Sequence, residues 1–485
     1  MDGRARKRDT RKFRQFIDGD RIRGHAGSFL LADECRNRED VNRHGFRRRD
    51  SYKGRRVLTL VFLILFILFL ALGMPVAFAL LAGPTGEAVW SGEPEVMTQL
   101  MLRLYYGIDS FPLMALPFFV LAGELMNRGG ITERLVNLSQ SFLRHYRGGL
   151  AQANIATSIL FAGLSGSAVA DTSAVGSVLI PAMERNGYTK RFSAAVTAAS
   201  SVIGPIIPPS GIMIMYAFMM DVSVAGLFAA GVVPGIVLGA SLMLLTAFLA
   251  RVRNFPVASE AATWSERGDA LSKGILPLLT PVIMLGGILL GIFTPTEAAA
   301  IAVGYALILV LFVMRTLSLP DLVDVLKQAS ITSGVILLLV GAAVSFASVL
   351  ALTGAPQRIT DSFLSVSENP LMLLFLVNVL LLIVGMFLDA GPAILILGPI
   401  LGPIFIGLDV HPLHFAIIMC VNVTVGLATP PMGLILFVAA GLTDERVEDI
   451  AKEMLPFLAV EIAIIFLVTF VPAISLTLPR LFGFL

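Results

Sequence analysis

Two segments of this chain carry the same unusual punctuation inside apolar sequence. Residues 204–218 read GPIIPPSGIMIMYAF and residues 426–440 read GLATPPMGLILFVAA, so Gly, a Pro-Pro pair and a second Gly recur in one order. Proline removes a backbone donor and clashes with the preceding helical turn, so each segment is expected to break a helix part-way through. Broken helices in matching positions of two halves are typical of the midplane binding site of a secondary transporter. The pattern therefore favours transport.

The composition places these helices in a membrane. Hydrophobic residues make up 56% of the chain and charged residues 14%, with a mean hydropathy of +0.84. From Val57 onward apolar runs recur, several of them near the roughly 20 residues that a bilayer core requires. Their hydrophobicity is continuous rather than alternating, which predicts helices and not barrel strands. We expect an all-α polytopic membrane protein.

The apolar runs predict nine membrane spans and two further elements. The spans are expected near residues 57–82, 98–127, 192–218, 224–250, 275–292, 296–314, 330–352, 412–440 and 456–480. Two other apolar stretches, 150–182 and 370–403, are rich in Gly, Ser and Pro and are interrupted by Asp171 and Asp389. Each is interpreted as a re-entrant hairpin with a polar tip inside the membrane. The alternative is that each forms a pair of ordinary spans.

Loop charges predict the orientation of the chain. Arg and Lys residues flank the first hairpin and fill the central loop, whereas the loops at 83–95 and 219–223 hold acids and no basic residue. The basic loops are expected in the cytoplasm, which puts the N-terminus inside and the C-terminus outside. The second hairpin then enters from the face opposite to the first.

An internal duplication is predicted by a shared order of residues, namely Gly-x3-Arg, an acid, Pro and Pro-Pro-x-Gly. Asp171 precedes Pro181 by ten positions, and Asp389 precedes Pro399 by ten. Together with the opposite hairpins this predicts two inverted repeats, at about 96–250 and 330–480, within a membrane domain of residues 57–485.

Residues 1–56 form a basic segment without an apolar run. We interpret it as a disordered N-terminal extension, or as the product of a start codon assigned too early, and its Phe spacing matches no nucleic-acid-binding motif. Cys35 and Cys420 cannot make a disulfide framework or a metal cluster. GLSGS at 163–167 is not the nucleophile elbow of hydrolases, and the chain has no G-x-x-x-x-G-K-[ST] loop. The chain is therefore not expected to be an enzyme, and an ion gradient is the expected driving force.

The predicted helix breaks could hold both a cation and an acid. A helix that stops at Gly204 or Gly426 leaves carbonyl groups with partial negative charge, which suit sodium. After Pro209 or Pro431 a new half-helix begins, and its free N–H groups favour a substrate carboxylate.

The hairpin tips add further polar groups. GLSGSAVAD at 163–171 supplies hydroxyls and flexible backbone before Asp171, and GMFLDAG at 385–391 places Asp389 between two glycines. A carboxylate near the bilayer centre costs roughly 2.5–3.5 kcal/mol, so each acid should have a role. Sodium binding and capping of the following half-helix both remain open. Glu297, after Pro295 and Thr296, is assigned a structural role in a first helical turn, and Glu461 has no companion motif.

Four segments resemble a known family. They are GLSGSAVADTSAVGSVLIPAMERNGY, VTAASSVIGPIIPPSGIMIMYAF, GMFLDAGPAILILGPILGPI and NVTVGLATPPMGLILFVAAGL. From Val57 to Leu485 the chain resembles the large membrane subunit, the DctM-type permease, of TRAP (tripartite ATP-independent periplasmic) transporters. The resemblance implies a fixed scaffold and an elevator-type transport domain built from inverted repeats with two hairpins.

The resemblance also implies a function and partners. These are sodium-coupled secondary import of a small organic acid across the bacterial inner membrane, with a small four-helix DctQ-type subunit and a periplasmic DctP-type binding protein. The alternative is a stand-alone divalent-anion:sodium symporter that needs no binding protein. C4-dicarboxylates, keto acids and sugar acids would use the same helix ends, so the substrate is left open.

Site residues are carried over by motif, with at least two sodium sites, one in each repeat. The predicted sodium ligands are Ser165, Gly166, Asp171, Gly204, Gly385, Asp389, Gly426 and Thr429. The predicted substrate-binding residues are Ser165, Ser167, Pro208, Pro209, Ser210, Thr429, Pro430 and Pro431.

Overall fold

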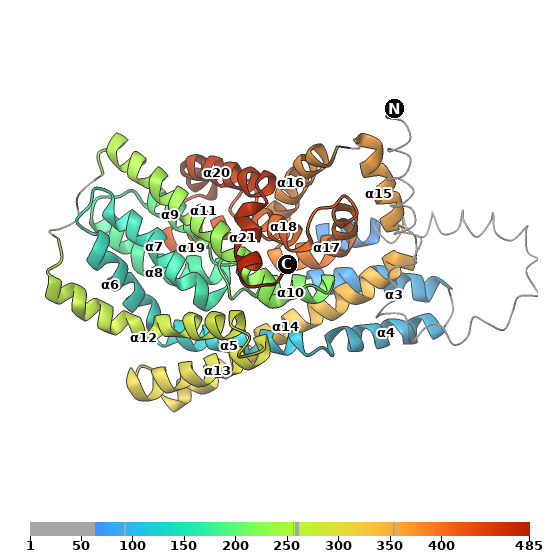
Figure 1. The fold of residues 1–485 in the computed structure, drawn as a ribbon, viewed down its shortest axis with the longest axis horizontal. Coiled ribbons are helices and arrows are strands. Elements are labelled where there is room, and N and C mark those ends of the chain that lie inside the picture. The colour runs from blue at the N-terminus through green and yellow to red at the C-terminus, as the bar shows by residue number, and fades with distance from the viewer. Residues whose placement is uncertain (1–63, 92–93, 256, 258–260, 353–354, 368) are drawn as a thin grey trace, which may run out of the picture.

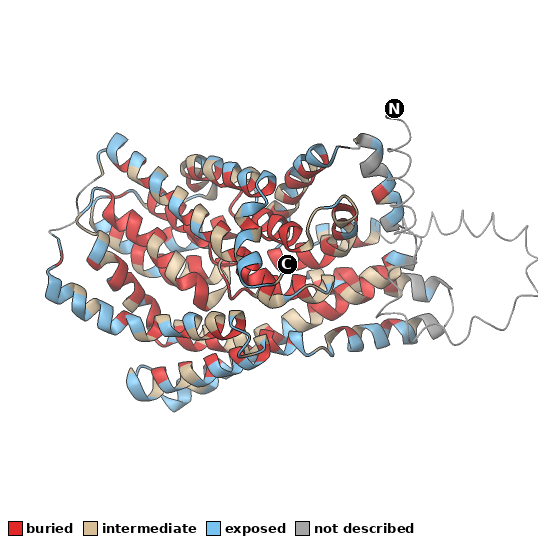
Figure 2. Cartoon of the chain, in the orientation of Figure 1, coloured by how far each residue is buried: buried red, intermediate tan, exposed pale blue. Residues whose placement is uncertain are grey.

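The computed structural model describes residues 64–485 apart from 92–93, 256, 258–260, 353–354 and 368, and over these residues it is built of helices without a strand (Figure 1). The basic N-terminal extension predicted at 1–56 lies outside the described residues. Buried residues concentrate in the helices at the centre of the molecule (Figure 2).

The helices of the first half follow one another with short connections. They are α3 (Val76–Ser91), α4 (Pro94–Ile108), η2 (Pro112–Met114), α5 (Ala115–Arg128), α6 (Ile131–Leu143), α7 (Gly149–Ser165), α8 (Ala168–Arg185), α9 (Lys190–Ser201), α10 (Gly211–Met220) and α11 (Val224–Val252). The remaining elements are α12 (Trp264–Leu289), α13 (Pro295–Ile308), η3 (Leu309–Val313), α14 (Leu319–Leu352), α15 (Ala355–Val366), α16 (Pro370–Phe387), α17 (Ala390–Ile406), α18 (Pro412–Gly426), α19 (Leu434–Thr443), α20 (Val447–Phe470) and α21 (Ala473–Leu481).

Both predicted hairpins and both predicted breaks are present. Two residues join α7 to α8 and two join α16 to α17, so the stretches expected at 150–182 and 370–403 are each a pair of helices. The segment 192–218 is divided into α9 and α10, and 412–440 into α18 and α19. The two Pro-Pro peptide bonds within these breaks are cis.

The number of uninterrupted spans is smaller than the nine predicted. By length and hydropathy, six helices in the described part of the chain can cross a membrane: α11, α12, α13 with η3, α14, α16 and α20, of which α16 is the first arm of the second hairpin and not one of the nine predicted spans. The span expected at 98–127 bends by 64° between Ile108 and Pro112. The span expected at 57–82 is interrupted before Pro75, and that at 456–480 before Pro472. Proline explains these interruptions, since it cannot donate the hydrogen bond that would continue the helix.

Two amphipathic helices were not predicted, because the sequence analysis located helices from apolar runs alone. They are α6 (Ile131–Leu143) and α15 (Ala355–Val366), and each begins directly after the Gly of a Gly-x3-Arg motif. Their apolar residues recur at helical spacing among polar ones, a pattern too polar to be recognised as a span. α6 packs on α7 and α12, and α15 contacts α14 and α17. Each therefore joins a hairpin helix to one of the long helices α12 and α14.

The helices form two packed groups. α3, α4, α5, α12, α13 and α14 pack on one another and form the lower layer of Figure 1. The hairpins, the broken helices, α11, α20 and α21 form the other group. This division agrees with the expected scaffold and transport domain.

Within the second group, contacts between the halves are exchanged symmetrically. The second arm of the first hairpin, α8, packs on α19, and the second arm of the second hairpin, α17, packs on α10. α9 packs on α20 just as α18 packs on α11. This exchange is the pattern expected of two related units. The repeat bounds of about 96–250 and 330–480 stay a prediction.

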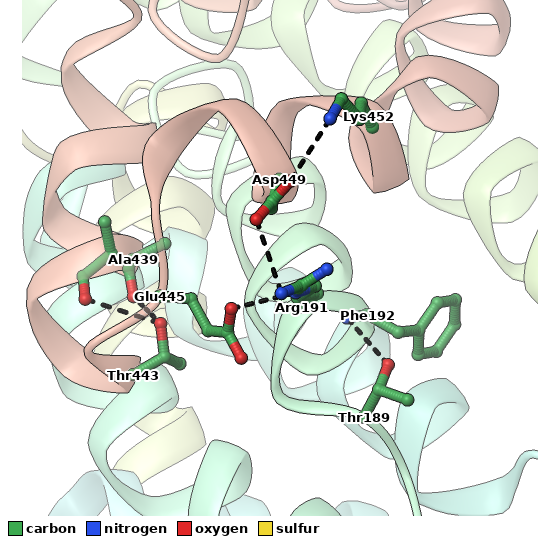
Figure 3. Close-up of polar contacts among 9 residues, drawn as sticks. Thr189, Arg191, Phe192, Ala439, Thr443, Glu445, Asp449 and Lys452 are labelled. Atoms are coloured by element: carbon green, nitrogen blue, oxygen red, sulfur yellow. Dashed lines mark hydrogen bonds and ion pairs between the residues drawn. The ribbon is translucent and has the colours of Figure 1, made fainter.

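The hairpins have their bases at opposite ends of α20. At its start, Arg191 binds Glu445 at 2.8 Å and Asp449 at 3.3 Å (Figure 3). The hydrogen bond to Glu445 and the nearby Asp449 carboxylate raise the pKa of Arg191 above its ordinary value. Arg191 follows the first hairpin by a short loop, so this end of α20 lies at the base of that hairpin.

The base of the second hairpin lies at the other end of α20. His414, which follows that hairpin, contacts the Ser475 hydroxyl at 2.7 Å and the Thr469 carbonyl at 3.1 Å. The two hairpins therefore enter from opposite faces, as an inverted repeat requires.

A labelling experiment tests this inversion. Asp221 and Asp444 are exposed, each ends the second half of a broken helix, and both have left-handed backbone with φ of 51° and 56°. In a Cys35→Ser background, where Cys420 is buried, we expect Asp444→Cys to react with an impermeant maleimide from the cytoplasm only. Asp221→Cys should react from the periplasm only. Labelling of both from the same side would contradict the inverted arrangement.

Candidate functional site

The tip of the first hairpin lies against the first helix break. A Cβ built on Gly166 would lie 2.9 Å from the Pro209 carbonyl oxygen and 3.3 Å from Cα of Ser210. A Cβ on Gly204 would lie 3.6 Å from the carbonyl group of Ser167. Five of the predicted residues are thus brought together by backbone contact, which only small residues at these points permit.

Local hydrogen bonds explain the shape of this tip. Gly166 has a φ of 58° and ends α7 in the left-handed conformation, which costs glycine little. The Ser167 hydroxyl accepts a hydrogen bond from the Ala170 N–H at 3.4 Å and so caps α8. The Ser165 hydroxyl accepts one from the Ser167 N–H at 3.4 Å. Both hydroxyl oxygens keep a lone pair for a cation.

Asp171 does not cap a helix. It lies in the first turn of α8 and is fully buried, and in the described part of the chain the hydrogen-bond geometry gives neither carboxylate oxygen a partner. The Ser158 and Ser201 side chains lie beside it. Each hydroxyl also has another acceptor in reach, because Ser158 lies 3.0 Å from the Ser200 hydroxyl and Ser201 lies 2.7 Å from the Thr197 carbonyl, so neither donor is committed to the carboxylate. A buried carboxylate without a committed donor requires a positive charge or a proton.

The surroundings of Asp171 are polar although they lie at the centre of the molecule. Hydrogen bonds connect α7 to α9 through Asn154, Thr197 and Ser200, with Asn154 Nδ2 2.7 Å from Thr197 Oγ1. The wholly buried polar residues here are Asn154, Thr157, Ser158, Asp171, Thr172, Ser193, Thr197, Ser200 and Ser201. The sequence signal was a run of Ser, Thr and Asn on apolar helices, which our site prediction did not use.

The second half of the first break presents an uncapped helix start. α10 begins at Gly211, and its N-cap Ser210 makes no side-chain hydrogen bond. The Ser210 hydroxyl is buried and has no partner among the described residues. α9 ends at Ser201, three residues before the predicted Gly204. The resulting gap includes Pro208 and Pro209. It is long enough to leave peptide groups between the two half-helices without intrahelical partners.

In the second hairpin, Asp389 is a helix cap. Its Oδ1 accepts a hydrogen bond from the Ala390 N–H at 2.7 Å, it is the N-cap of α17, and the residue is exposed. Its structural counterpart is therefore Ser167, the N-cap of α8, and not Asp171. The ten-residue spacing to proline aligned the two acids incorrectly, because it matched residues four positions apart in the two hairpins.

The second break is held closely by the second hairpin. A Cβ on Gly426 would lie 2.6 Å from Cα of Gly385, so α16 and α18 touch through their backbones. The Thr429 hydroxyl donates to the Val425 carbonyl at 2.8 Å. Pro431 is exposed and Pro430 partly so, and α19 begins at Leu434. The contacts thus bring Gly385 and Gly426 together, as predicted.

The backbone contacts at Gly166 and at Gly385 join each hairpin to the break of its own half, while the second arms α8 and α17 pack on the half-helices α19 and α10 of the other half. Among the described residues no hydrogen bond links Ser165 or Ser167 to the predicted substrate residues Thr429–Pro431. In the same part of the chain no group of three or more His, Cys, Asp or Glu side chains could hold a metal ion. The candidate site consists of two half-sites made of peptide groups, hydroxyls and single acids.

Sequence comparison identifies the family. Residues 63–474 match the family model of the DctM component of the tripartite ATP-independent periplasmic transporter. This chain belongs to that family. Its fold and its family make it a multi-pass inner-membrane protein, a TRAP large permease of the secondary transport class.

Several curated relatives carry substrate names. The chain is 38% identical over 439 residues to the C4-dicarboxylate TRAP transporter large permease DctM of Rhodobacter capsulatus, covering 87% of this chain and 99% of the relative. It is 38% identical to the sialic acid permease SiaM of Vibrio cholerae, covering 84% and 96%. It is 39% identical to the isethionate permease DctMQ of Oleidesulfovibrio alaskensis, covering 85% of this chain but only 65% of that relative.

A solved structure supports the fold. The YdaH transporter of Alcanivorax borkumensis aligns with a TM-score of 0.56 over 81% of this chain and 90% of that chain. At 15% identity this likeness concerns the fold alone. The prediction of a helical inverted-repeat transporter with hairpins and broken helices is confirmed.

Proposed function

We propose that this TRAP large permease imports a small organic carboxylate into the cytoplasm, driven by sodium. The observation that carries the proposal is the close contact of the first hairpin tip with the first helix break, at Gly166 and Pro209. It gathers hydroxyl and peptide oxygens around the uncapped start of a half-helix. A cation and an acid can be held side by side in such an arrangement.

Sodium fits the groups that are present. The first site would use the hydroxyls at the hairpin tip, peptide oxygens near Gly204 and the buried carboxylate of Asp171. Oxygen ligands of this kind suit hard cations. The second site would lie where Gly385 meets Gly426, close to Thr429. Asp389, although it caps α17, keeps one carboxylate oxygen for this purpose.

The electrical driving force sets a lower limit on the stoichiometry. Each sodium ion that enters gains about 2.3 kcal/mol per 100 mV of inside-negative potential, and each negative charge that enters loses the same. Two sodium ions therefore drive a monocarboxylate, whereas a dicarboxylate needs a third. We propose at least two sites.

The proposed substrate is bound at helix starts. The N–H groups at the start of α10 and the unpartnered Ser210 hydroxyl favour a carboxylate. The names of the relatives, a C4-dicarboxylate permease and a sialic acid permease among them, suggest the same class. Membership of the family favours the two expected partners, a small membrane subunit and a periplasmic binding protein.

Reconstitution tests the proposal. We expect proteoliposomes that contain this chain and a small subunit to accumulate an organic acid only when an inward sodium gradient and the loaded binding protein are both supplied. Asp171→Asn removes the proposed charged sodium ligand and should reduce uptake at limiting sodium by about tenfold or more. A tenfold change corresponds to about 1.4 kcal/mol of sodium binding. The matched control is Asp269→Asn, since Asp269 is exposed and pairs with Lys273 on the surface of α12.

Three results would contradict parts of this proposal. Equal uptake with potassium in place of sodium would overturn sodium coupling. Full uptake without the binding protein would favour the stand-alone symporter. Wild-type sodium dependence in Asp171→Asn would remove that residue from the site.

A further inference from the structure

Glu461 is a second enclosed carboxylate to which the proposed function assigns no role. It lies in the middle of α20 and is fully buried, and neither of its carboxylate oxygens has a hydrogen-bond partner among the residues that the structure describes. The neighbouring buried positions, including Phe457 and Ile465, show that it belongs to the stripe of α20 that faces the interior. A charged group there without a partner would cost several kcal/mol, so the enclosed carboxylate requires a proton or a cation.

The register of α20 places Glu461 at the depth of the second hairpin tip. Asn378 on α16 donates to the Thr469 hydroxyl at 3.0 Å, which puts these two residues at the same level. α20 runs opposite to α16, and Glu461 precedes Thr469 by eight residues, about 12 Å along a helix. Eight residues beyond Asn378 lies Met386, next to the tip at Leu388 and Asp389. Eight residues make about 2.2 turns, so Thr469 and Glu461 lie about 80° apart within the one buried stripe of α20.

A comparison of α20 with α11, its counterpart in the first half, places Glu461 at the same depth independently. Glu461 follows the helix-ending Asp444 by 17 residues, and Leu238 follows Asp221 by 17. The same count pairs Thr469 with Thr246, and both are buried threonines. Beside Leu238, a Cβ on Gly235 would overlap the side chain of Ile207, so this stretch of α11 lies on the first break. The corresponding stretch of α20 is thereby placed on the second break.

We propose that the Glu461 carboxylate holds a monovalent cation, a proton or sodium, beside the second helix break. The proposal rests on the proposed function and adds a site to it. The Asp389 carboxylate already caps α17, whereas Glu461 has both oxygens free. Asn422 of α18 also has a buried amide oxygen without a partner among the described residues, but its Nδ2 donates to Asn378 Oδ1 at 2.6 Å, which places it nearer the level of Thr469 than that of Glu461. The two unsatisfied carboxylate oxygens of Glu461 therefore require a donor or a cation of their own.

Few other charges act on Glu461. The helices packed on α20 are α9, α11, α16, α18 and α19, and α16 and α19 carry no titratable residue. Lys190 and Arg191 lie at the start of α9 and Arg251 at the end of α11. On α18, His414 is hydrogen-bonded to Ser475 and Thr469. Cys420, also on α18, is a buried thiol. The acids of α20 itself other than Glu461 lie in its first two turns.

The test uses two substitutions in the complete reconstituted transporter. Glu461→Gln keeps the shape and removes the charge, and Glu461→Leu installs the residue that the first half has at this position. Thr246→Val is the matched control, because Thr246 is also fully buried with an unpartnered oxygen. Uptake is measured against sodium concentration at several pH values, and the purified proteins are unfolded thermally with and without sodium chloride.

We expect both Glu461 variants to fold, with a thermal midpoint no lower than that of the native protein, and to lose cation coupling. If the ion is sodium, the Hill coefficient for sodium falls by about one and sodium protects less against unfolding. If it is a proton, sodium dependence stays and the pH dependence of uptake at acid pH disappears. Unchanged sodium and pH profiles in Glu461→Gln, or in a folded Glu461→Leu, would overturn the proposal. Loss of sodium dependence in the native protein itself would instead overturn the proposed function, leaving the pH profile to decide on Glu461.

Discussion

Replacement of Gly166 by alanine is expected to abolish uptake, with a loss of about 100-fold or more, while the protein still folds. The new Cβ would lie 2.9 Å from the Pro209 oxygen and 3.3 Å from the Ser210 backbone, so the tip of the first hairpin would be forced away from the break. Backbone atoms cannot rotate aside as a side chain can. Overpacking of this kind costs about 1–3 kcal/mol. A loss of about 2.8 kcal/mol corresponds to about 100-fold, because each 1.4 kcal/mol is tenfold. Uptake into proteoliposomes and thermal unfolding measure the two effects separately.

Gly130→Ala separates the contact from the backbone conformation. Gly130 has a φ of 73°, close to the 58° of Gly166, and a Cβ there would meet no atom within 4 Å. Left-handed backbone costs an L-residue about 1–2 kcal/mol at either position. We expect Gly130→Ala to lower the thermal midpoint slightly and to retain uptake. Comparable uptake in both variants would mean that the contact of Gly166 with the first break is not needed for transport.

The positions of glycine and proline in the sequence predicted the parts of the candidate site that depend on backbone geometry. The breaks at Pro209 and Pro431 and the tips at Gly166 and Asp389 follow from local rules, because proline lacks a donor and glycine permits positive φ. The same rules explain the close contact of Gly385 with Gly426. Such features are local, so the sequence shows them without knowledge of the packing.

Features that depend on packing were not predictable in this way. The role of Asp171 depends on which residue occupies the N-cap, and Ser167 takes that position. The spacing to Pro181 could not show this, because a proline inside an apolar helix fixes no register for the helix start. Glu461 stood alone in an apolar run, and only the packing of α20 shows that both of its oxygens are enclosed. The helices α6 and α15 were missed because hydropathy detects spans and not amphipathic links.

Gly426→Ala is expected to damage the second half-site by a different route, through the packing of two helices. Its Cβ would lie 2.6 Å from Cα of Gly385 and 3.1 Å from the Leu382 oxygen, so α16 and α18 would have to separate along their whole contact. Overpacking of this kind costs about 1–3 kcal/mol. We expect a clearly lower thermal midpoint together with a loss of uptake, because the tip of the second hairpin moves with α16. Gly385→Ala should act alike, since its Cβ would lie 2.7 Å from the Val423 oxygen.

Gly441→Ala, in the adjoining half-helix α19, is the control for Gly426→Ala. Gly441 is an exposed residue of α19, and a Cβ there would meet no atom within 4 Å. Alanine is favoured over glycine inside a helix by up to about 1 kcal/mol, so Gly441→Ala should keep or raise the thermal midpoint and leave uptake unchanged. If Gly426→Ala were as stable and as active as Gly441→Ala, the two backbones would not need to touch. The second half-site would then depend on the side chains of Thr429 and Glu461 rather than on the approach of the second hairpin to its break.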